Sequence, residues 1–404
     1  MATDTTQINP DLDTIPIHSE TSDRPAWSAV LSMSLGVFAL VTAEFLPASL
    51  LTPLAQGLGI SEGAAGQAVT ATALVALISS LLVSFVIRDF NRRWVVMGLT
   101  VLLIASNLVV ARAPGLGVLL FGRILMGMAL GGFWSLSIGI VMRLVPSEAI
   151  PRALAIMFMG VSAATVFAVP VGSYLGEAIG WRGVFFAAAG LAVVSLVFQM
   201  LTLPSLPVEG VESRASLLEV LRRPGIGIGM LAALLVFAGH FTFFTYLRPF
   251  LEKVTGLGID GVTSVLFGFG LANFAGTYLV AYLIERSLRL ALIVLPLTMI
   301  VLALLLVSFG KFAPFDAFLV AIWGLVFAGI PVSWSTWITR ALPDDAEAGG
   351  SLIVAAINFA IASGAGLGGA ILETSGPKAV FLASGVILII AVTVITRRVA
   401  HIRP

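Results

Sequence analysis

Leu116–Arg143 reads LGVLLFGRILMGMALGGFWSLSIGIVMR, an apolar run long enough for a membrane-spanning helix, with one charge, Arg123, lodged inside it. A guanidinium within hydrocarbon is costly, so this side chain has to face a helix bundle or a wet cavity and find a partner there. The segment therefore predicts a helical membrane protein with a functional site near Arg123.

The composition of the whole chain indicates the same class. Its 404 residues are 59% hydrophobic and 11% charged, and the mean hydropathy is +1.07, outside the range of soluble domains. The net charge of +1 and the lack of basic runs argue against a nucleic-acid partner. With no cysteine and only three histidines, two of them in the terminal tails, we expect no disulfide, no metal site and no cofactor.

Twelve segments are apolar over about the 20 residues needed to cross a bilayer. They are Trp27–Leu54, Ser61–Ile87, Trp94–Ala111, Leu116–Met142, Ile150–Leu175, Val184–Leu203, Ile226–Leu251, Gly261–Ile284, Leu290–Phe309, Phe315–Ile338, Gly349–Leu372 and Ala379–Ile395. An even number puts both termini on one side of the membrane. Fifteen of the 22 Lys and Arg residues fall on that side and six on the other, which predicts cytoplasmic termini.

Short sequence matches indicate a duplicated unit. Four patterns of the first half recur in the same order in the second half. Arg24-Pro25 and Gly57-Leu-Gly-Ile60 recur 199 positions later. Arg143-x-x-Pro146-x-x-Ala149 recurs 197 positions later, and Gly180-x-x-x-Val184-Phe185 recurs 196 positions later. Their constant order at equivalent segment ends implies two parallel six-helix units.

The longest interior break, Pro204–Pro224, separates these two units. We predict a cytoplasmic tail over 1–26, helical bundles over 27–203 and 225–396, a cytoplasmic linker over 204–224 and a second tail over 397–404. Two like bundles on a linker can rock against each other and expose a central site to one side of the membrane at a time.

Three ionisable side chains stand out inside the predicted spans: Glu44, Arg123 and His240. At about 1.5 Å per residue all three fall roughly 10–17 Å below the same surface, so they can share one layer. A group that binds and releases a proton there would couple solute movement to a proton gradient, and we predict this role for these residues. The alternatives are a structural ion pair or snorkelling for Arg123, an interhelical hydrogen bond for Glu44 and core packing for His240.

Uncharged polar and aromatic residues of the spans are the candidate ligands of a solute. Amides both donate and accept hydrogen bonds, as a neutral polar solute requires, and aromatic faces can stack on a planar ring. The predicted solute-binding residues are Gln67, Thr70, Trp134, His240, Phe244, Asn273, Trp334 and Asn358. Each is also suited to packing or to interhelical hydrogen bonding, which in lipid is worth about 0.6 kcal/mol.

Two motifs carry a resemblance to the major facilitator superfamily. Ser84-Phe-Val-Ile-Arg88-Asp89-Phe-Asn91-Arg92-Arg93 resembles its loop pattern G-x-x-x-D-R-x-G-R-R, with Ser and Asn at the glycine positions, and Ala281-x-x-x-Glu285-Arg286-x-x-Arg289 is similar to the second-half copy. Arg123 with Gly127 resembles the R-x-x-x-G motif. The resemblance implies a charge latch between helices formed by Arg88, Asp89, Arg92, Arg93, Glu285, Arg286 and Arg289, and proton coupling through Arg123.

The chain resembles in particular the twelve-span proton-coupled efflux branch of this family. The stretches GEAIGWR (176–182), FFTYLRP (243–249) and WSTWITR (334–340) are similar to those of its purine nucleoside exporters. This resemblance implies an all-α fold of two six-helix bundles, and export of inosine- or guanosine-like nucleosides in exchange for protons. It also implies a monomer in the bacterial inner membrane, with a small solute and the lipid bilayer as its partners.

Other functions stay open within transport. A drug, sugar or arabinoside exporter of the same branch is the alternative, because the polarity of the site and not the fold sets the substrate. A membrane-embedded enzyme is not expected, since the spans bring no cluster of acids, histidines or metal ligands. A sensor or scaffold would normally carry a soluble domain, for which the longest loop is too short.

Overall fold

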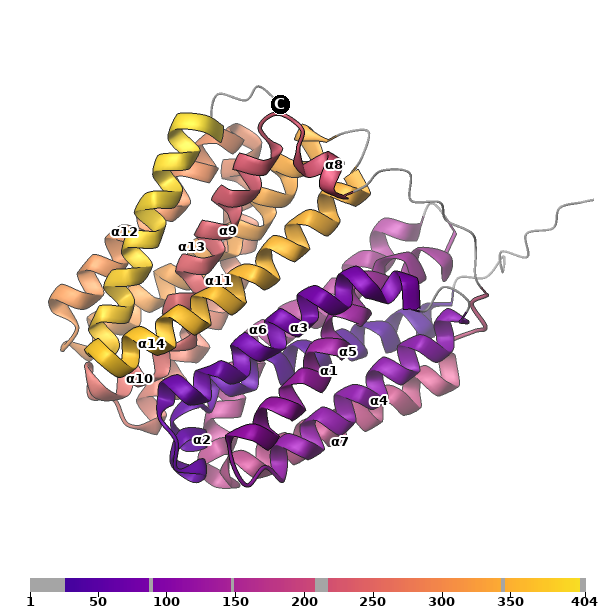
Figure 1. The fold of residues 1–404 in the computed structure, drawn as a ribbon, viewed down its shortest axis with the longest axis horizontal. Helices are drawn as coiled ribbons and strands as arrows, with labels where there is room; N and C mark the ends of the chain where they lie inside the picture. Colours follow the sequence, from indigo (N-terminus) through magenta and orange to yellow (C-terminus); the bar gives the residue numbers. More distant parts are fainter. Residues whose placement is uncertain (1–25, 87–89, 147–148, 208–216, 343–345, 400–404) are drawn as a thin grey trace, which may run out of the picture.

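The computed structural model describes residues 26–86, 90–146, 149–207, 217–342 and 346–399, and its regular elements there are helices (Figure 1). The first half contains α1 (Trp27–Ser49), α2 (Leu51–Leu58), α3 (Glu62–Val86), α4 (Arg92–Ala111), α5 (Leu116–Arg143), α6 (Ile150–Ala178) and α7 (Gly180–Thr202). The second contains α8 (Leu217–Leu221), α9 (Ile226–Thr245), α10 (Leu247–Lys253), α11 (Ile259–Arg286), α12 (Leu288–Phe309), α13 (Ala313–Ala341), α14 (Ala346–Val394) and a final π-helical turn, Ile395–Val399.

Within the described residues, eleven helices are long and apolar enough to cross a membrane. The last of them, α14, is two helices joined end to end, because Gly376 inside it has φ 77° and ψ 179°, which is not helical. Pro377 follows directly. The break falls between the two segments that the sequence predicts last, so the predicted twelve-span, all-α fold is confirmed.

The packing of the helices repeats from one half to the other. In the first half α1 packs on α6, α3 on α5 and α4 on α7, while in the second half α9 packs on α14, α11 on α13 and α12 on α14. The left-handed glycines repeat as well, with Gly180 (φ 74°) matching Gly376 (φ 77°) and Gly59 (φ 64°) matching Gly256 (φ 76°).

These glycines correct one detail of the predicted repeat. The sequence pairs Gly57 with Gly256 at 199 positions, whereas the backbone pairs Gly59 with Gly256 at 197, in line with the other matches. Only glycine adopts a positive φ without strain, so conformation is the better guide to register. Arg24-Pro25 and Pro343 lie outside the described residues.

Two predicted spans, 27–54 and 226–251, are each interrupted by a proline. Pro53 has no N–H to donate to the carbonyl of Ser49, and α1 ends at Ser49. Pro249 likewise cannot donate to the carbonyl of Thr245, which is the last residue of α9. The linking residues have nearly the same conformation, Leu50 at φ −106° and ψ 14° and Tyr246 at φ −112° and ψ 17°. Pro249 lies 196 positions after Pro53, so the break belongs to the duplicated unit.

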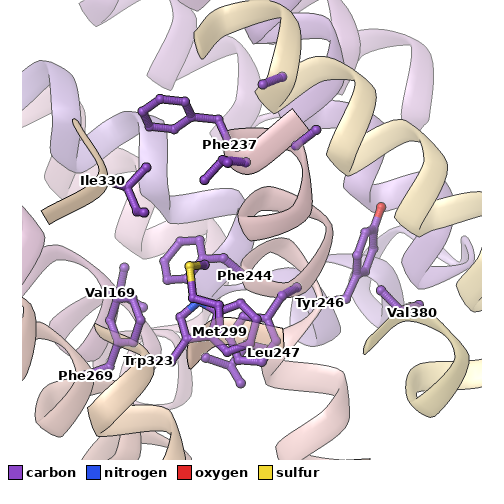
Figure 2. Close-up of a cluster of buried hydrophobic side chains, with 14 of the residues drawn as sticks. Val169, Phe237, Phe244, Tyr246, Leu247, Phe269, Met299, Trp323, Ile330 and Val380 are labelled. Carbon is purple, nitrogen blue, oxygen red and sulfur yellow. The ribbon is translucent and has the colours of Figure 1, made fainter. Parts of the chain in front are cut away.

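The two halves meet at the end of the molecule that carries α2 and α10, called here the α2–α10 end. One continuous apolar core joins most of the second half to first-half residues near that end, among them Leu50, Leu54 and Val169. A second core consists of first-half residues alone. Figure 1 shows the ribbons of the halves close together at α2 and α10 and farther apart toward α8, and Figure 2 shows Val169 beside Phe269 and Phe244 in the shared core.

Candidate functional site

Arg123 lies on α5 with its side chain fully buried. The guanidinium binds across two neighbouring helices: Nη1 donates to the carbonyl of Ala43 (3.0 Å) on α1, and Nε donates to Thr72 Oγ1 (2.9 Å) on α3. Weaker bonds reach the backbone carbonyls of Ala68 (3.4 Å) and Glu44 (3.5 Å). Arg123 therefore ties three helices of the first half together.

The carbonyl of Ala43 is open to Arg123 because Pro47 follows four residues later. In a continuous helix the N–H of residue 47 would occupy that carbonyl, and proline has none. An unpaired backbone carbonyl at membrane depth has no water to bind, so a charged donor from a neighbouring helix stabilises it. The sequence predicted a partner for Arg123 without naming it; the nearest acceptors in the structure are the Ala43 carbonyl, which Pro47 leaves free, and the Thr72 hydroxyl.

Glu44 stands beside this arginine on α1 with its side chain half-buried. The Arg123 guanidinium reaches the Glu44 backbone, and the Glu44 carboxylate has no hydrogen bond or ion pair with any residue that the structure describes. A carboxylate with free acceptors next to a buried guanidinium can bind a proton or a polar solute without breaking a contact of its own.

His240, on α9 in the other half, is only 2% exposed. Trp323 Nε1 donates a hydrogen bond to its Nδ1 (3.1 Å), and its ring stacks on Phe327. The imidazole is thus held as an acceptor inside the second bundle. In this conformation its contacts are those of a packed core residue, and its predicted roles in coupling and binding stay predictions.

An aromatic pair joins the two halves next to these groups. Phe45, the neighbour of Glu44, meets Phe244 edge to face with ring centroids 6.0 Å apart, and Phe244 lies 5.4 Å from the His240 ring. Figure 2 shows Phe244 between Ile330 and the layer of Trp323 and Met299. A series of contacts thus links Arg123 to His240 across the boundary between the bundles, through the Glu44 backbone, Phe45 and Phe244.

The remaining predicted ligands fall into two groups. Gln67 and Thr70, on α3, are half-buried and have no hydrogen-bond partner among the described residues, and the Thr70 hydroxyl is itself shielded from solvent. The other members are already engaged: Asn273 with the Gly324 carbonyl (3.0 Å), Asn358 with the Val354 carbonyl (3.0 Å), Trp134 stacked on Phe158 and Trp334 buried against Trp337. Among the predicted ligands, open polar capacity thus lies on α3 of the first half.

The predicted charge latch is only partly within the described residues. Arg88, Asp89 and the side chain of Glu285 lie outside them, and Arg286 and Arg289 are exposed. Arg93 Nη2 donates to the Met200 carbonyl (2.9 Å) on α7, while the backbone N–H of Arg92 donates to the Leu206 carbonyl (3.0 Å). These bonds join α4 to α7 and to the segment after it.

Asn91 was not among the predicted latch residues. Its Oδ1 accepts from the N–H of Arg93 (3.0 Å), capping α4, and from the N–H of Leu206 (3.1 Å). Its Nδ2 donates to Ser205 Oγ (2.7 Å). A cap residue two positions before Arg93 and three before the apolar run from Trp94 was the available signal, and it replaces the glycine of the family pattern.

Arg248 is the second residue that the sequence reading missed. It was counted among the loop cations of the non-cytoplasmic side, yet it is 6% exposed and bonds to both halves. The signal was Pro53, four residues after Ser49, whose carbonyl Arg248 binds. Within the described part of the chain, no group of three or more His, Cys, Asp or Glu residues is placed to hold a metal ion.

Two pseudo-symmetric six-helix bundles, with a buried arginine and a neighbouring acid in the first of them, define a secondary membrane transporter. The family model of the Major Facilitator Superfamily matches residues 33–354, so the chain belongs to that superfamily. It is a transporter and not an enzyme.

Curated relatives match over nearly the whole chain. The "Purine ribonucleoside efflux pump NepI" of Escherichia coli O6:H1 is 46% identical over 376 residues, covering 93% of this chain and 95% of the relative. The protein of the same name from Salmonella typhimurium strain LT2 gives the same identity and coverage.

Solved structures share the fold at low identity. The nucleoside transporter NupG superposes with a TM-score of 0.74 at 13% identity, covering 91% of this chain and 99% of that one. A D-xylose–proton symporter also gives 0.74, at 16% identity, with coverage of 93% and 98%. These two likenesses show the fold alone.

Proposed function

We propose that this chain exports purine ribonucleosides across the bacterial inner membrane in exchange for protons, by alternating access and as a monomer with cytoplasmic termini. The observation that carries the proposal is the 46% identity over 93% of the chain to proteins named for purine ribonucleoside efflux. At this identity over the full length, the residues that contact solute can be kept along with the fold.

The chemistry of the site supports a neutral, ring-bearing polar solute. Phe45 and Phe244 offer aromatic faces at the boundary of the halves, on which a purine can stack. Glu44, Gln67 and Thr70 lie on the adjoining helices with hydrogen-bonding capacity that no described residue uses. Ribose hydroxyls and purine N–H groups are the donors that such a set would take up.

The coupling of proton and nucleoside movement rests on a difference between Arg123 and Glu44: the arginine side chain is held by hydrogen bonds, whereas the Glu44 carboxylate is not held by any described residue. Arg123 is held by backbone carbonyls and Thr72, so its position does not depend on the charge of Glu44. Glu44 can therefore cycle between a carboxylate, which accepts hydrogen bonds from a nucleoside, and a protonated acid, which accepts them poorly. Competition between proton and nucleoside for one carboxyl yields exchange, and no cofactor beyond the coupling proton is needed.

The deciding experiment is uptake of labelled inosine into proteoliposomes, with and without an imposed pH gradient. If the chain exchanges nucleosides for protons, inosine should accumulate in the direction set by the pH gradient, and a protonophore should abolish this accumulation. Labelled arabinose serves as the solute control. Inosine movement that ignores the gradient would refute proton coupling. Arabinose transport without inosine transport would refute the nucleoside assignment and favour the sugar alternative.

A further inference from the structure

Arg248 on α10 is one of the few charged side chains buried between the halves, being only 6% exposed. Its Nε pairs with Glu252 Oε1 (2.7 Å) in its own half. Its Nη1 donates to the backbone carbonyl of Ser49 on α1 and to Ser173 Oγ (3.3 Å) on α6, both in the first half. A single guanidinium therefore bridges the halves at the α2–α10 end.

The Ser49 carbonyl is open to Arg248 because of Pro53. The helical bonds on either side of the gap are present, from Leu50 N–H to the Leu46 carbonyl (2.9 Å) and from Leu54 N–H to the Leu50 carbonyl (2.9 Å). The bond between them would come from residue 53, which has no N–H. Ser49 is also the last residue of α1, where carbonyls carry the negative end of the helix dipole, so a cation from the opposite half caps this helix.

The duplication explains why the contact is one-sided. Arg248 lies 195 positions after Pro53 and 196 after Thr52, so Thr52 occupies the equivalent site in the first half. Thr52 Oγ1 donates to Glu252 Oε2 (2.6 Å), and Arg248 takes Oε1 of the same carboxylate. The two equivalent residues thus converge on Glu252 from opposite halves, but only the arginine is long enough to reach the other half's freed carbonyl as well.

Other polar contacts at this end are of a weaker kind. Lys253 pairs with Glu62 (2.7 Å) across the halves, with the lysine side chain 54% exposed, and Ser61 bonds to Glu373. Exposed pairs contribute little to stability. A recess of about 550 Å³, lined in part by Thr52, Glu62 and Lys253, brings solvent to these groups. Arg248 is therefore more deeply buried than the charged pair Lys253–Glu62, and its loss is expected to cost more when the halves part.

We propose that Arg248 is the gate residue of the α2–α10 end, which it closes by capping the Ser49 carbonyl that Pro53 leaves free. On opening, the guanidinium leaves Ser49 and Ser173, keeps Glu252 and is hydrated through the recess. The freed carbonyl then takes water as well, so no buried group is left unpaired in either conformation. The inference rests on the alternating access of the proposed function, but not on which solute is carried.

The test measures distances between spin labels without any solute. Because the chain has no cysteine, the pair Gln56→Cys and Asp260→Cys labels the α2–α10 end without prior removal of native thiols, and Met142→Cys with Thr339→Cys labels the opposite end. In the parent chain we expect a short distance to dominate at the α2–α10 end. Arg248→Gln should raise the proportion of a longer distance about tenfold relative to the short one, which corresponds to about 1.4 kcal/mol.

Pro53→Ala gives an independent route to the same bond. Alanine returns an N–H to the Ser49 carbonyl, which then has a partner inside its own helix, so this variant should also favour the longer distance. Arg248→Gln combined with Pro53→Ala should shift the distances no further than the stronger single variant, because both act on one bond. Lys253→Gln, at the exposed pair, is the matched control and should change the ratio less than twofold.

Unchanged distances in both Arg248→Gln and Pro53→Ala would overturn the proposal, as would an equal shift in Lys253→Gln. If Arg248→Gln does not fold, Pro53→Ala still decides. Labels that never move at either end, under any proton gradient, would refute alternating access and the proposed function with it. Labels that respond as expected while inosine is not transported would refute only the nucleoside assignment.

Discussion

Replacing Arg123 with methionine should destabilise the protein by a limited amount that the structure allows to be worked out. Thr72 Oγ1 keeps its bond to the Ala68 carbonyl (2.9 Å), so it is not left unpaired. The Ala43 carbonyl loses its donor, because Pro47 cannot supply one. One unsatisfied buried carbonyl costs about 1–3 kcal/mol. Methionine fills similar space, and removal of a buried charge offsets part of this loss.

Pro47→Ala separates the structural role of Arg123 from its role in coupling. An alanine at 47 returns an N–H to the Ala43 carbonyl, so the double variant Arg123→Met with Pro47→Ala should recover most of the lost stability. Proton-driven transport should remain absent, because the charge next to Glu44 is still missing. Pro47→Ala alone is the matched control and should keep transport.

The free energy of unfolding can be followed by tryptophan fluorescence during denaturant titration in detergent, since the chain has seven tryptophans. Transport is measured in proteoliposomes of the same preparations. A double variant that regains both stability and gradient-driven transport would show that Arg123 acts through structure alone. A single variant as stable as the parent would refute the importance of the Ala43 bond.

Two further predictions use the same assays. Glu44→Gln should abolish gradient-driven accumulation while leaving solute exchange without a gradient, and unaltered accumulation in that variant would exclude Glu44 as the proton carrier. Gly66→Ala should weaken closure of the α2–α10 end, because a Cβ there collides with the Tyr246 hydroxyl, and overpacking of this kind costs about 1–3 kcal/mol. Gly98→Ala is the control, because a Cβ at Gly98 has no atom within 4 Å. Tyr246→Phe, which removes the colliding hydroxyl, should relieve part of the effect of Gly66→Ala. Equal label distances in Gly66→Ala and Gly98→Ala would contradict this prediction.

Much of the architecture could be predicted from local pattern. Apolar length predicts the spans, because only closed backbone hydrogen bonding is tolerated in lipid, and that requirement acts within each segment. The repeat could be found from short matches, although Gly59 and not Gly57 is the partner of Gly256, because only conformation distinguishes two neighbouring glycines. The breaks after Ser49 and Thr245 were missed, since the apolar pattern continues through both prolines.

The candidate site was predicted less completely. Arg123 and Glu44 are neighbours, as their shared depth suggested, but the arginine binds backbone instead of the carboxylate. The sequence could not show whether the ring nitrogens of His240 bind a solute or a neighbouring side chain. Only the position of Trp323 shows that Nδ1 already accepts a hydrogen bond within the protein. Residue type gives hydrogen-bonding capacity, whereas the neighbours decide whether that capacity is free.

The sequence by itself determined the membrane-spanning helices, their duplication and the places where proline leaves a carbonyl unpaired. The tertiary structure alone decided which donors fill those carbonyls: Arg123 is 80 positions from Ala43, and Arg248 is 199 positions from Ser49. A proline removes a local bond wherever it occurs, so its effect can be predicted from the sequence. The donor that replaces it depends on which helix packs alongside. For Ala43 that is settled when the first bundle folds, and for Ser49 only when the two bundles meet.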